Sequence, residues 1–299
     1  MAVSLENKIV VGVSSRALFD LDEENNIFVQ QGVEAYSKYQ KDHENDILKP
    51  GIAFPLVKAL QKLNFEGEDL VEIIVMSKNS SDTSLRIFNS IKYYKLNITR
   101  AALVSGSLVA PYLGAFKTDL FLSANEADVQ EAINADIAAG LICGHSKATI
   151  DPYETIDQIR IAFDGDAVIF SDESERIFKS EGLDAFTKYE EKNARNPLPE
   201  GPFAKFLKTI SIVQQQFSDS EIKPIRTALV TARSAPAHER VIRTLQAWNV
   251  TIDEAFFLGG LKKSEILKAF GAHIFFDDQD VHINPASSVV PSAKVLYKR

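Results

Sequence analysis

The chain has 299 residues, of which 45% are hydrophobic and 25% are charged, and its formal net charge is −8. This ordinary globular composition suggests roughly two domains, and the negative charge opposes the clustered Lys and Arg that binding a nucleic-acid backbone requires. The only cysteine, Cys143, excludes an internal disulfide, and the five histidines show no close metal-ligand spacing with it, which disfavours zinc.

The N-terminal segment places Glu6 and Lys8 before a short apolar run and lacks the core of a signal peptide. No stretch of the sequence approaches the ~18 apolar residues of a membrane-spanning helix. We therefore expect a soluble cytoplasmic protein that binds neither membranes nor nucleic acids. The sequence leaves the oligomeric state open, a homo-oligomer included.

Short apolar, β-branched runs alternate with longer amphipathic segments along the chain. Runs this short, each ended by polar residues or glycine, are typical of buried parallel strands. Residues 84–94 and 238–248 instead carry apolar side chains at helical spacing. The alternation predicts an α/β fold with doubly wound parallel sheets. The expected strands are Lys8–Val13, Val71–Met76, Ala101–Val104, Leu120–Leu122, Ile159–Phe163, Thr227–Val230, Ala255–Leu258 and Ile274–Phe276.

Each half of the chain also has a helical insert between its first and second expected strand. The first insert covers about 21–69 and the second about 171–223. In the second, we expect helices over 182–193 and 202–216, separated by the helix-breaking segment 196–199. We expect each insert to form a cap over its half of the fold.

The two halves of the sequence are similar to each other. Residues 13–19 align with 163–169 at an offset of 150, and residues 76–125 align without gaps with 230–279 at an offset of 154. Self-similarity across nearly the whole chain implies tandem copies of one domain. The expected division is a first domain at 1–127, a connection at 128–157 with a helix over 128–141 and a linker around 145–152, and a second domain at 158–299.

The copies differ where polar chemistry is concentrated. Five residues of the second half, Asp164, Asp166, Lys263, Asp277 and Asp278, stand opposite Ser14, Arg16, Val109, Ser123 and Ala124 of the first. We therefore expect the second half to be the working copy. The first half is predicted to be a degenerate copy without catalytic residues.

Carboxylates follow two of the expected strands in the second half. Asp164 and Asp166 leave a strand at positions i and i+2, which point to the same side, so we expect them to share one small volume. Asp277 and Asp278 are adjacent after another apolar strand, where burial is costly unless a cation or water satisfies them. Two interpretations are open. Either these acids lie in solvated turns, or they provide a nucleophile, an acid–base group and oxygen ligands for Mg²⁺.

A hydroxyl group and a lysine follow the other two strands. Thr231 stands at a strand end where free N–H groups at a helix start can hold a phosphate, although threonine at such a position is also a common N-cap. Lys262 and Lys263 follow a glycine pair and either begin a solvated helix or supply a cation. Four acids, a hydroxyl and a lysine at successive strand ends predict a Mg²⁺ and phosphate site.

These motifs resemble those of the haloacid dehalogenase (HAD) superfamily of phosphatases, in the residues Asp164-Gly165-Asp166-Ala167-Val168, Thr231, Lys263 and Asp277-Asp278. More narrowly, residues 14–20, 163–175, 231–240 and 275–279 resemble the cytosolic 5'-nucleotidase I family, and the resemblance covers essentially the whole chain. It implies two tandem HAD-like (Rossmannoid) halves. It also implies Mg²⁺-dependent hydrolysis of nucleoside 5'-monophosphates, with AMP as a substrate.

The resemblance assigns roles by position. Asp164 corresponds to the nucleophile that forms an aspartyl-phosphate, and Asp166 to the acid that protonates the leaving oxygen and then activates water. Thr231 and Lys263 correspond to the residues that hold the phosphoryl group, Lys263 being preferred to Lys262 by its spacing from the glycine pair. The implied Mg²⁺ ligands are Asp164, the backbone carbonyl of Asp166, and Asp277, with Asp278 as a ligand or an anchor behind them.

Two other functions fit the sequence. One is a HAD phosphatase or phosphotransferase acting on another small phosphate, and the other is a non-enzymatic nucleotide sensor, suggested by the degenerate first half. The presence of both Asp164 and Asp166 argues against a sensor. Base and sugar preference stay open, since the aromatic residues of the second insert either stack on a base or fill the core of the cap: Phe178, Phe186, Tyr189 and Phe203.

Overall fold

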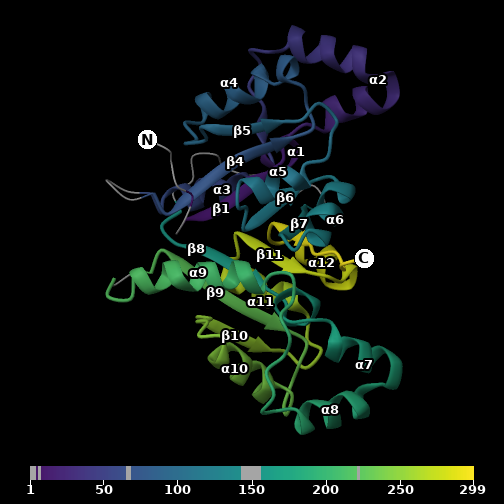
Figure 1. The fold of residues 1–299 in the computed structure, drawn as a ribbon, viewed down its shortest axis with the longest axis vertical. Helices are drawn as coiled ribbons and strands as arrows, with labels where there is room; N and C mark the ends of the chain where they lie inside the picture. Colours follow the sequence, from purple (N-terminus) through teal and green to yellow (C-terminus); the bar gives the residue numbers. More distant parts are fainter. Residues whose placement is uncertain (1–4, 6–7, 65–68, 143–155, 221–222) are drawn as a thin grey trace.

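The structure is a computed structural model, and it describes residues 5, 8–64, 69–142, 156–220 and 223–299. Its centre is a ten-stranded sheet with the strand order β10-β9-β8-β11-β12-β7-β6-β1-β4-β5 (Figure 1). A separate two-stranded sheet pairs β2 (Phe19–Asp20) with β3 (Lys49–Pro50). The strands of the large sheet are β1 (Ile9–Val13), β4 (Val71–Ser77), β5 (Arg100–Leu103), β6 (Leu120–Ser123), β7 (Ala138–Ile142), β8 (Ile159–Phe163), β9 (Ile225–Thr231), β10 (Glu254–Phe257), β11 (Ile274–Asp277) and β12 (Ser292–Lys294).

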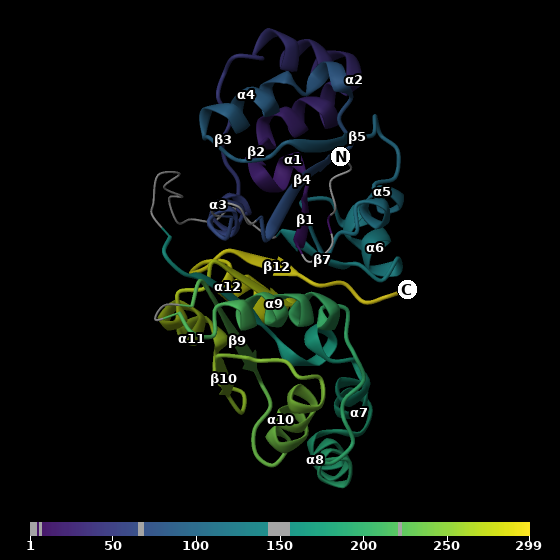
Figure 2. The same ribbon diagram turned by 60° about the vertical axis from the view of Figure 1, so that its left-hand side comes forward.

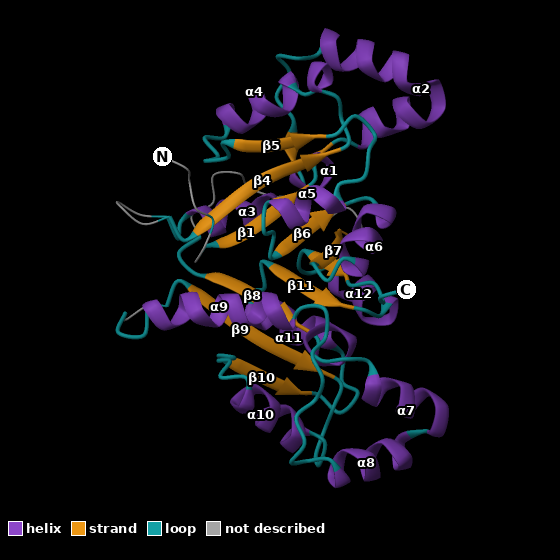
Figure 3. Ribbon diagram, in the orientation of Figure 1, coloured by secondary structure: helices purple, strands orange, loops and turns teal. Residues whose placement is uncertain are grey.

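The helices flank the central strands (Figure 3). Across the described ranges, none of them combines the length and the apolar character needed to cross a membrane. A short 3-10 helix, η1, spans Ser81–Thr83, and a π-type turn, η2, spans Gly165–Ile169. The α-helices are α1 (Ser15–Leu18), α2 (Asp22–Asp42), α3 (Phe54–Gln61), α4 (Leu85–Tyr93), α5 (Ala110–Ala115), α6 (Glu126–Asn134), α7 (Glu173–Glu181), α8 (Leu183–Lys192), α9 (Ala204–Gln216), α10 (His238–Ala247), α11 (Lys263–Phe270) and α12 (Asp280–Ala286).

The two halves of the large sheet have the same strand order. From the outer edge inward, the first half runs β5-β4-β1-β6-β7 and the second half runs β10-β9-β8-β11-β12. Equivalent residues form equivalent pairs: Val13 lies opposite Val75, and Phe163 lies opposite Leu229. Every neighbouring pair of strands in this sheet is parallel except β12 and β7, which join the halves in an antiparallel pair. The halves therefore share one continuous sheet, whereas we expected separate sheets.

The predicted strands and the two predicted amphipathic helices are confirmed. All eight expected strands are present within a few residues of their predicted bounds, and residues 84–94 and 238–248 contain α4 and α10. These elements were predictable because their β-branched runs and helical apolar spacing report local structure directly.

The prediction for the connection between the halves is wrong in part. The helix expected over 128–141 is α6, which ends at Asn134 because the chain turns at Asp136 with a positive φ of 59°. Residues 138–142 then form β7, which pairs with β6 and with β12 of the second half. Residues 138–142 of the expected connection therefore belong to the sheet. The linker expected around 145–152 lies outside the described residues.

The helical inserts project from opposite ends of the molecule (Figures 1 and 2). α2 of the first half bends at Gly32, and α7 and α8 of the second half meet at Gly182; both glycines have a φ of +83°. α9 lies along the sheet instead, with Phe206 and Ile210 fully buried. Because α9 covers the sheet, the projecting part of the second insert is limited to α7 and α8.

Gly201 is packed so closely that no side chain fits. A Cβ atom built on Gly201 would lie 2.2 Å from the backbone oxygen of Phe170, a distance that only backbone movement relieves. We expect Gly201→Ala to lower the free energy of unfolding by about 3 kcal/mol or more, measured by urea denaturation. The matched control is Gly114→Ala in α5, where a Cβ meets nothing within 4 Å; an equal loss of stability there would contradict the packing argument.

Candidate active site

The candidate site begins at the turn after β8. The backbone N–H of Asp164 donates to the carbonyl of Phe276 at 2.8 Å, which ties the ends of β8 and β11 together. The chain then enters η2, where Ala167 has a φ of +60°, a conformation that costs an alanine roughly 1–2 kcal/mol. The equivalent turn of the first half is the regular helical turn α1. The backbone therefore differs between the halves at the position where the acids stand.

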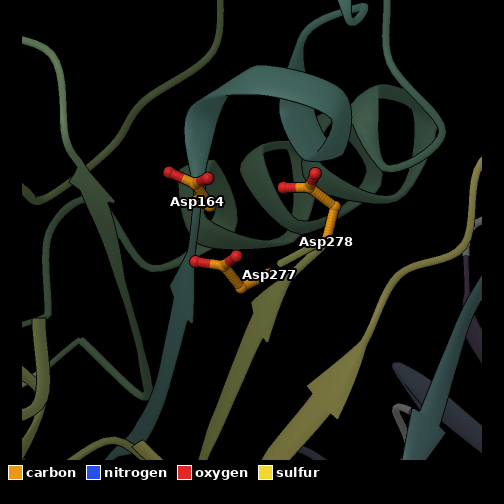
Figure 4. A group of neighbouring side chains, drawn as sticks. All are labelled: Asp164, Asp277 and Asp278. Atoms are coloured by element: carbon orange, nitrogen blue, oxygen red, sulfur yellow. The ribbon is translucent and has the colours of Figure 1, made fainter. Parts of the chain in front are cut away.

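Three carboxylates converge at the ends of these strands (Figure 4). Asp164, Asp277 and Asp278 each have a side-chain oxygen within 4.8 Å of an oxygen of the other two. Their exposed fractions are 4%, 0% and 3%, so water screens their repulsion poorly. The structure thus brings together three of the four acids predicted from the sequence.

Lys263 supplies the nearest positive charge. Its Nζ lies 2.7 Å from Asp164 Oδ1 and 2.7 Å from Asp277 Oδ2, and the residue is buried. Lys262, in contrast, is exposed. Of the two lysines after the glycine pair, Lys263 is therefore the one that contacts the acids.

Burial and charge shift the pKa values of these groups. Burial alone would lower the pKa of Lys263, but the carboxylates of Asp164 and Asp277 raise it above its usual value. Burial, together with the charge of Asp164, raises the pKa of Asp277 well above its usual range, although Lys263 offsets part of the effect. Burial also raises the pKa of Asp278 to about 7. The raised pKa values show that full ionisation of the three acids is unfavourable when Lys263 is the only cation beside them among the described residues.

Asp278 is held by residues that the sequence did not single out. The hydroxyl of Tyr297 donates to Asp278 Oδ2 and lies 3.0 Å from Glu175 Oε2. Gln279 Nε2 donates to the other oxygen of Glu175 at 2.9 Å. Glu175 and Tyr297 thus hold Asp278 in position. They lie far apart in the sequence, on α7 and in the C-terminal segment, so their contact with Asp278 becomes visible only in the folded chain.

Asp166 is not one of the three converging acids, and its carboxylate has other partners. Arg233 donates two hydrogen bonds to Asp166, from Nε to Oδ2 at 2.8 Å and from Nη2 to Oδ1 at 2.6 Å. Arg233 is itself 4% exposed and also donates from Nη1 to Glu190, which pairs in turn with Arg240 at 3.0 Å. Arg233, Glu190 and Arg240 were missed as site residues, and the position of Arg233 two residues after Thr231 was the only local signal.

Thr231 ends β9 beside the same turn. Its side chain is 1% exposed, and its Oγ1 accepts a hydrogen bond from the backbone N–H of Arg233 at 3.2 Å. A Cβ built on Gly165 would lie 3.5 Å from this oxygen, which places Thr231 next to the residue that follows Asp164. The hydroxyl proton of Thr231 is thus available to a ligand at this turn.

The aromatic residues of the second insert divide between surface and core. Phe203 is fully buried, with its ring 4.7 Å from that of Phe276, and therefore belongs to the core. Phe178 is 49% exposed. The guanidinium of Arg233 lies 5.4 Å from the centroid of the Phe186 ring, and that of Arg240 lies 5.4 Å from the centroid of the Tyr189 ring.

The three acids fit a divalent cation of the hard, oxygen-preferring type. Asp278 Oδ1 is buried and has no hydrogen-bond partner among the residues that the structure describes. Three carboxylates and one ammonium group leave two negative charges when all are ionised, and a divalent cation neutralises both. Carboxylate oxygens without histidine or cysteine favour a hard divalent cation over zinc.

The fold and the site together define an α/β protein with a buried carboxylate and lysine centre at the ends of parallel strands. The chain matches the model of the 5'-nucleotidase family across residues 1–299 and therefore belongs to that family. A human relative, cytosolic 5'-nucleotidase 1B, is 42% identical to it over 292 residues, which is 94% of this chain and 47% of the human protein. The chain thus spans about half the length of that relative.

Proposed function

We propose that this chain is a Mg²⁺-dependent 5'-nucleotidase that hydrolyses nucleoside 5'-monophosphates, AMP among them, to nucleoside and phosphate. The observation that carries the proposal is the buried group of Asp164, Asp277, Asp278 and Lys263 in a chain that belongs to the 5'-nucleotidase family. The name of the human relative favours a cytosolic location as well.

Asp164 is the proposed nucleophile. Its carboxylate stands at the end of β8 and forms an aspartyl-phosphate, which splits one difficult displacement into two easier ones. Lys263 and Thr231 hold the phosphoryl oxygens, because a largely dissociative transition state depends on positioning and charge neutralisation. Lys263 is already fixed by two acids, so its charge needs little reorganisation.

Asp166 is the proposed acid and base. It protonates the leaving ribose oxygen and then takes a proton from the water that hydrolyses the aspartyl-phosphate. Both of its oxygens are bound by Arg233, which Glu190 fixes from the other side. Arg233 is therefore a positioning residue for Asp166.

Asp164 and Asp277 would hold Mg²⁺ together with the backbone carbonyl of Asp166, and Asp278 would be a further ligand or an anchor. When bound, the cation neutralises charge on the phosphoryl oxygens and orients them. The acids around it supply the charge that the cation requires.

The first half is proposed to be a degenerate HAD-like copy. It has the strand order of the second half, and Ser14 and Ser123 stand where the second half has Asp164 and Asp277. Two serines supply no negative charge for a divalent cation, and Arg16 at the position of Asp166 repels it. The sequence predicted domains at 1–127 and 158–299; because β7 pairs with β6, we propose that the first domain extends to residue 142.

A phosphate-release assay tests the proposed function. The purified chain is assayed with Mg²⁺ on a panel of nucleoside monophosphates and sugar phosphates, with and without acceptor nucleosides. The proposal expects the highest kcat/KM on nucleoside 5'-monophosphates and release of free phosphate. Preference for sugar phosphates would indicate another phosphatase, transfer to the acceptor would indicate a phosphotransferase, and nucleotide binding without turnover would indicate a sensor.

Arg233→Lys tests the positioning of Asp166. Lysine keeps the positive charge but lacks the planar fork that binds both oxygens of Asp166 and also Glu190. We expect kcat to fall about 10- to 100-fold, with a smaller change in KM, measured by steady-state phosphate release. The control is Arg243→Lys on α10, an exposed residue paired with Glu239; an equal loss there would show that the effect is not specific to the site.

A further inference from the structure

The first half contains a cavity at the position that corresponds to the proposed active site. Its volume is about 610 Å³, which lies within the usual range for sites that bind a small molecule. The residues that follow β1 and β4 line its floor, and α2 lines its wall. A degenerate copy that had only a supporting role would have no need to keep such a space open.

Serine hydroxyls form the floor of this cavity. Ser14, Ser77 and Ser123 stand where the second half has Asp164, Thr231 and Asp277. The backbone N–H of Ser14 donates to Leu122 at 2.8 Å, as that of Asp164 does in the second half. The floor therefore keeps this contact between the strand ends, although the turn after β1 differs from the turn after β8, and it replaces two carboxylates with neutral groups that can donate hydrogen bonds.

Two buried donors in the cavity have no partner within the described part of the chain. Arg16 Nε and Asn79 Nδ2 both have almost no solvent-accessible surface and form no hydrogen bond there. The amide oxygen of Asn79 already accepts from the hydroxyl of Tyr36 at 3.1 Å, which turns its NH₂ group away from Tyr36. An unsatisfied buried donor costs roughly 1–3 kcal/mol, so a ligand that accepts from both recovers this energy.

The charges around the cavity leave Arg16 as its least neutralised cation. Each acid of the lining is paired with a cation at a short distance: Glu24 with Arg86, Asp82 with Lys41, and Asp128 with Lys78. The ion pair of Arg16 with Asp22 is longer, at 3.8 Å between Nη2 and Oδ1, and the side chain of Asp22 is 46% exposed. An oxyanion at the floor therefore meets a guanidinium, an amide and hydroxyl groups without facing an unpaired carboxylate.

The wall of the cavity is apolar. Phe28, Val33, Tyr36 and Met76 line it, and the rings of Phe28 and Tyr36 pack edge to face at 5.9 Å. Phe28 and Val33 are 47% and 66% exposed, so the wall presents apolar surface to solvent. A ring attached to the oxyanion covers them.

We propose that the first-half cavity binds a phosphate monoester that carries a ring, such as a nucleoside monophosphate, without a divalent cation. The phosphate accepts from Arg16, Asn79 and the serine hydroxyls, and the ring lies against Phe28 and Tyr36. This proposal does not depend on the activity of the second half.

Isothermal titration calorimetry of the full chain in EDTA tests the proposal, with AMP, inorganic phosphate and adenosine as separate probes. We expect one AMP per chain without metal, and competition by inorganic phosphate. Arg16→Gln and Asn79→Asp should each raise Kd about tenfold or more, because each removes a donor to a charged group. Asn79→Asp keeps the oxygen that accepts from Tyr36, so it conserves the fold.

Two control variants locate the binding. Arg100→Gln changes an arginine of the same half that pairs with Glu72 outside the cavity, and Thr231→Ala changes the second half; both should leave Kd within about twofold. No binding of AMP in EDTA, binding lost in Thr231→Ala but kept in Arg16→Gln, or adenosine binding as tightly as AMP would overturn the proposal. Turnover of AMP with Mg²⁺, measured on the same samples, reports separately on the proposed function.

Discussion

Asp164→Asn is expected to abolish turnover, with kcat lower by at least about 10⁴-fold, while the fold stays intact. The amide fills the same volume but cannot attack phosphorus. Lys263 keeps its ion pair with Asp277 at 2.7 Å, so the substitution leaves no buried ammonium without a carboxylate. The measurement is single-turnover phosphate release at saturating AMP and Mg²⁺, together with thermal unfolding.

Two further observations make this test specific. Beryllium fluoride, which mimics an aspartyl-phosphate, should inhibit the wild type. The control is Asp136→Asn, a surface aspartate that pairs with Lys298, which should retain full activity. Substantial turnover by Asp164→Asn would show that another group attacks phosphorus or that water attacks directly.

The sequence could predict the elements of the sheet and most of the acid cluster because both are local properties. A β-branched run ends where the polar residues begin, so Asp164, Asp277 and Thr231 could be placed at strand ends without knowledge of the fold. Parallel strands then bring those ends to one edge, which predicts that the residues are neighbours.

The contacts of Asp166 could not be predicted in this way. Glu190 lies on α8, in a segment whose other charged residues are solvated, yet it is 1% exposed and binds both Arg233 and Arg240. These contacts join residues 43 and 50 positions apart and depend on how α8 packs over β9 and α10. The join between β7 and β12 is equally non-local, and it was missed for the same reason.

Each half contains a buried ion pair, but the acid of the pair occupies a different position in the two halves. The second half pairs Arg240 with Glu190, and the equivalent Arg86 of the first half pairs with Glu24. The positions are exchanged: Glu24 corresponds to Ser174, and Glu190 corresponds to Gln40. Each half therefore keeps one acid for its buried arginine, because an unpaired buried charge would cost several kcal/mol. In the second half, the acid at position 190 binds Arg233 as well as Arg240.

Removal of divalent metal is expected to lower turnover by at least about 10³-fold, and added Mg²⁺ should restore it. Without the cation, Asp164, Asp277 and Asp278 face one another with only Lys263 to neutralise them, and a phosphate dianion would add to that repulsion. Full activity after thorough treatment with EDTA would rule out a metal at these acids.

Thermal unfolding gives a second measure of the metal that does not depend on turnover. A ligand present at 100 times its Kd stabilises the folded state by about 2.7 kcal/mol, so saturating Mg²⁺ should raise the Tm of the wild type. Asp277→Asn should remove most of this shift, since it replaces a fully buried carboxylate of the cluster. Asp280→Asn, three residues further on and paired with Lys294 at the surface, should retain it. An equal Mg²⁺-dependent shift in both variants would place the cation elsewhere, because only Asp277 belongs to the three converging acids.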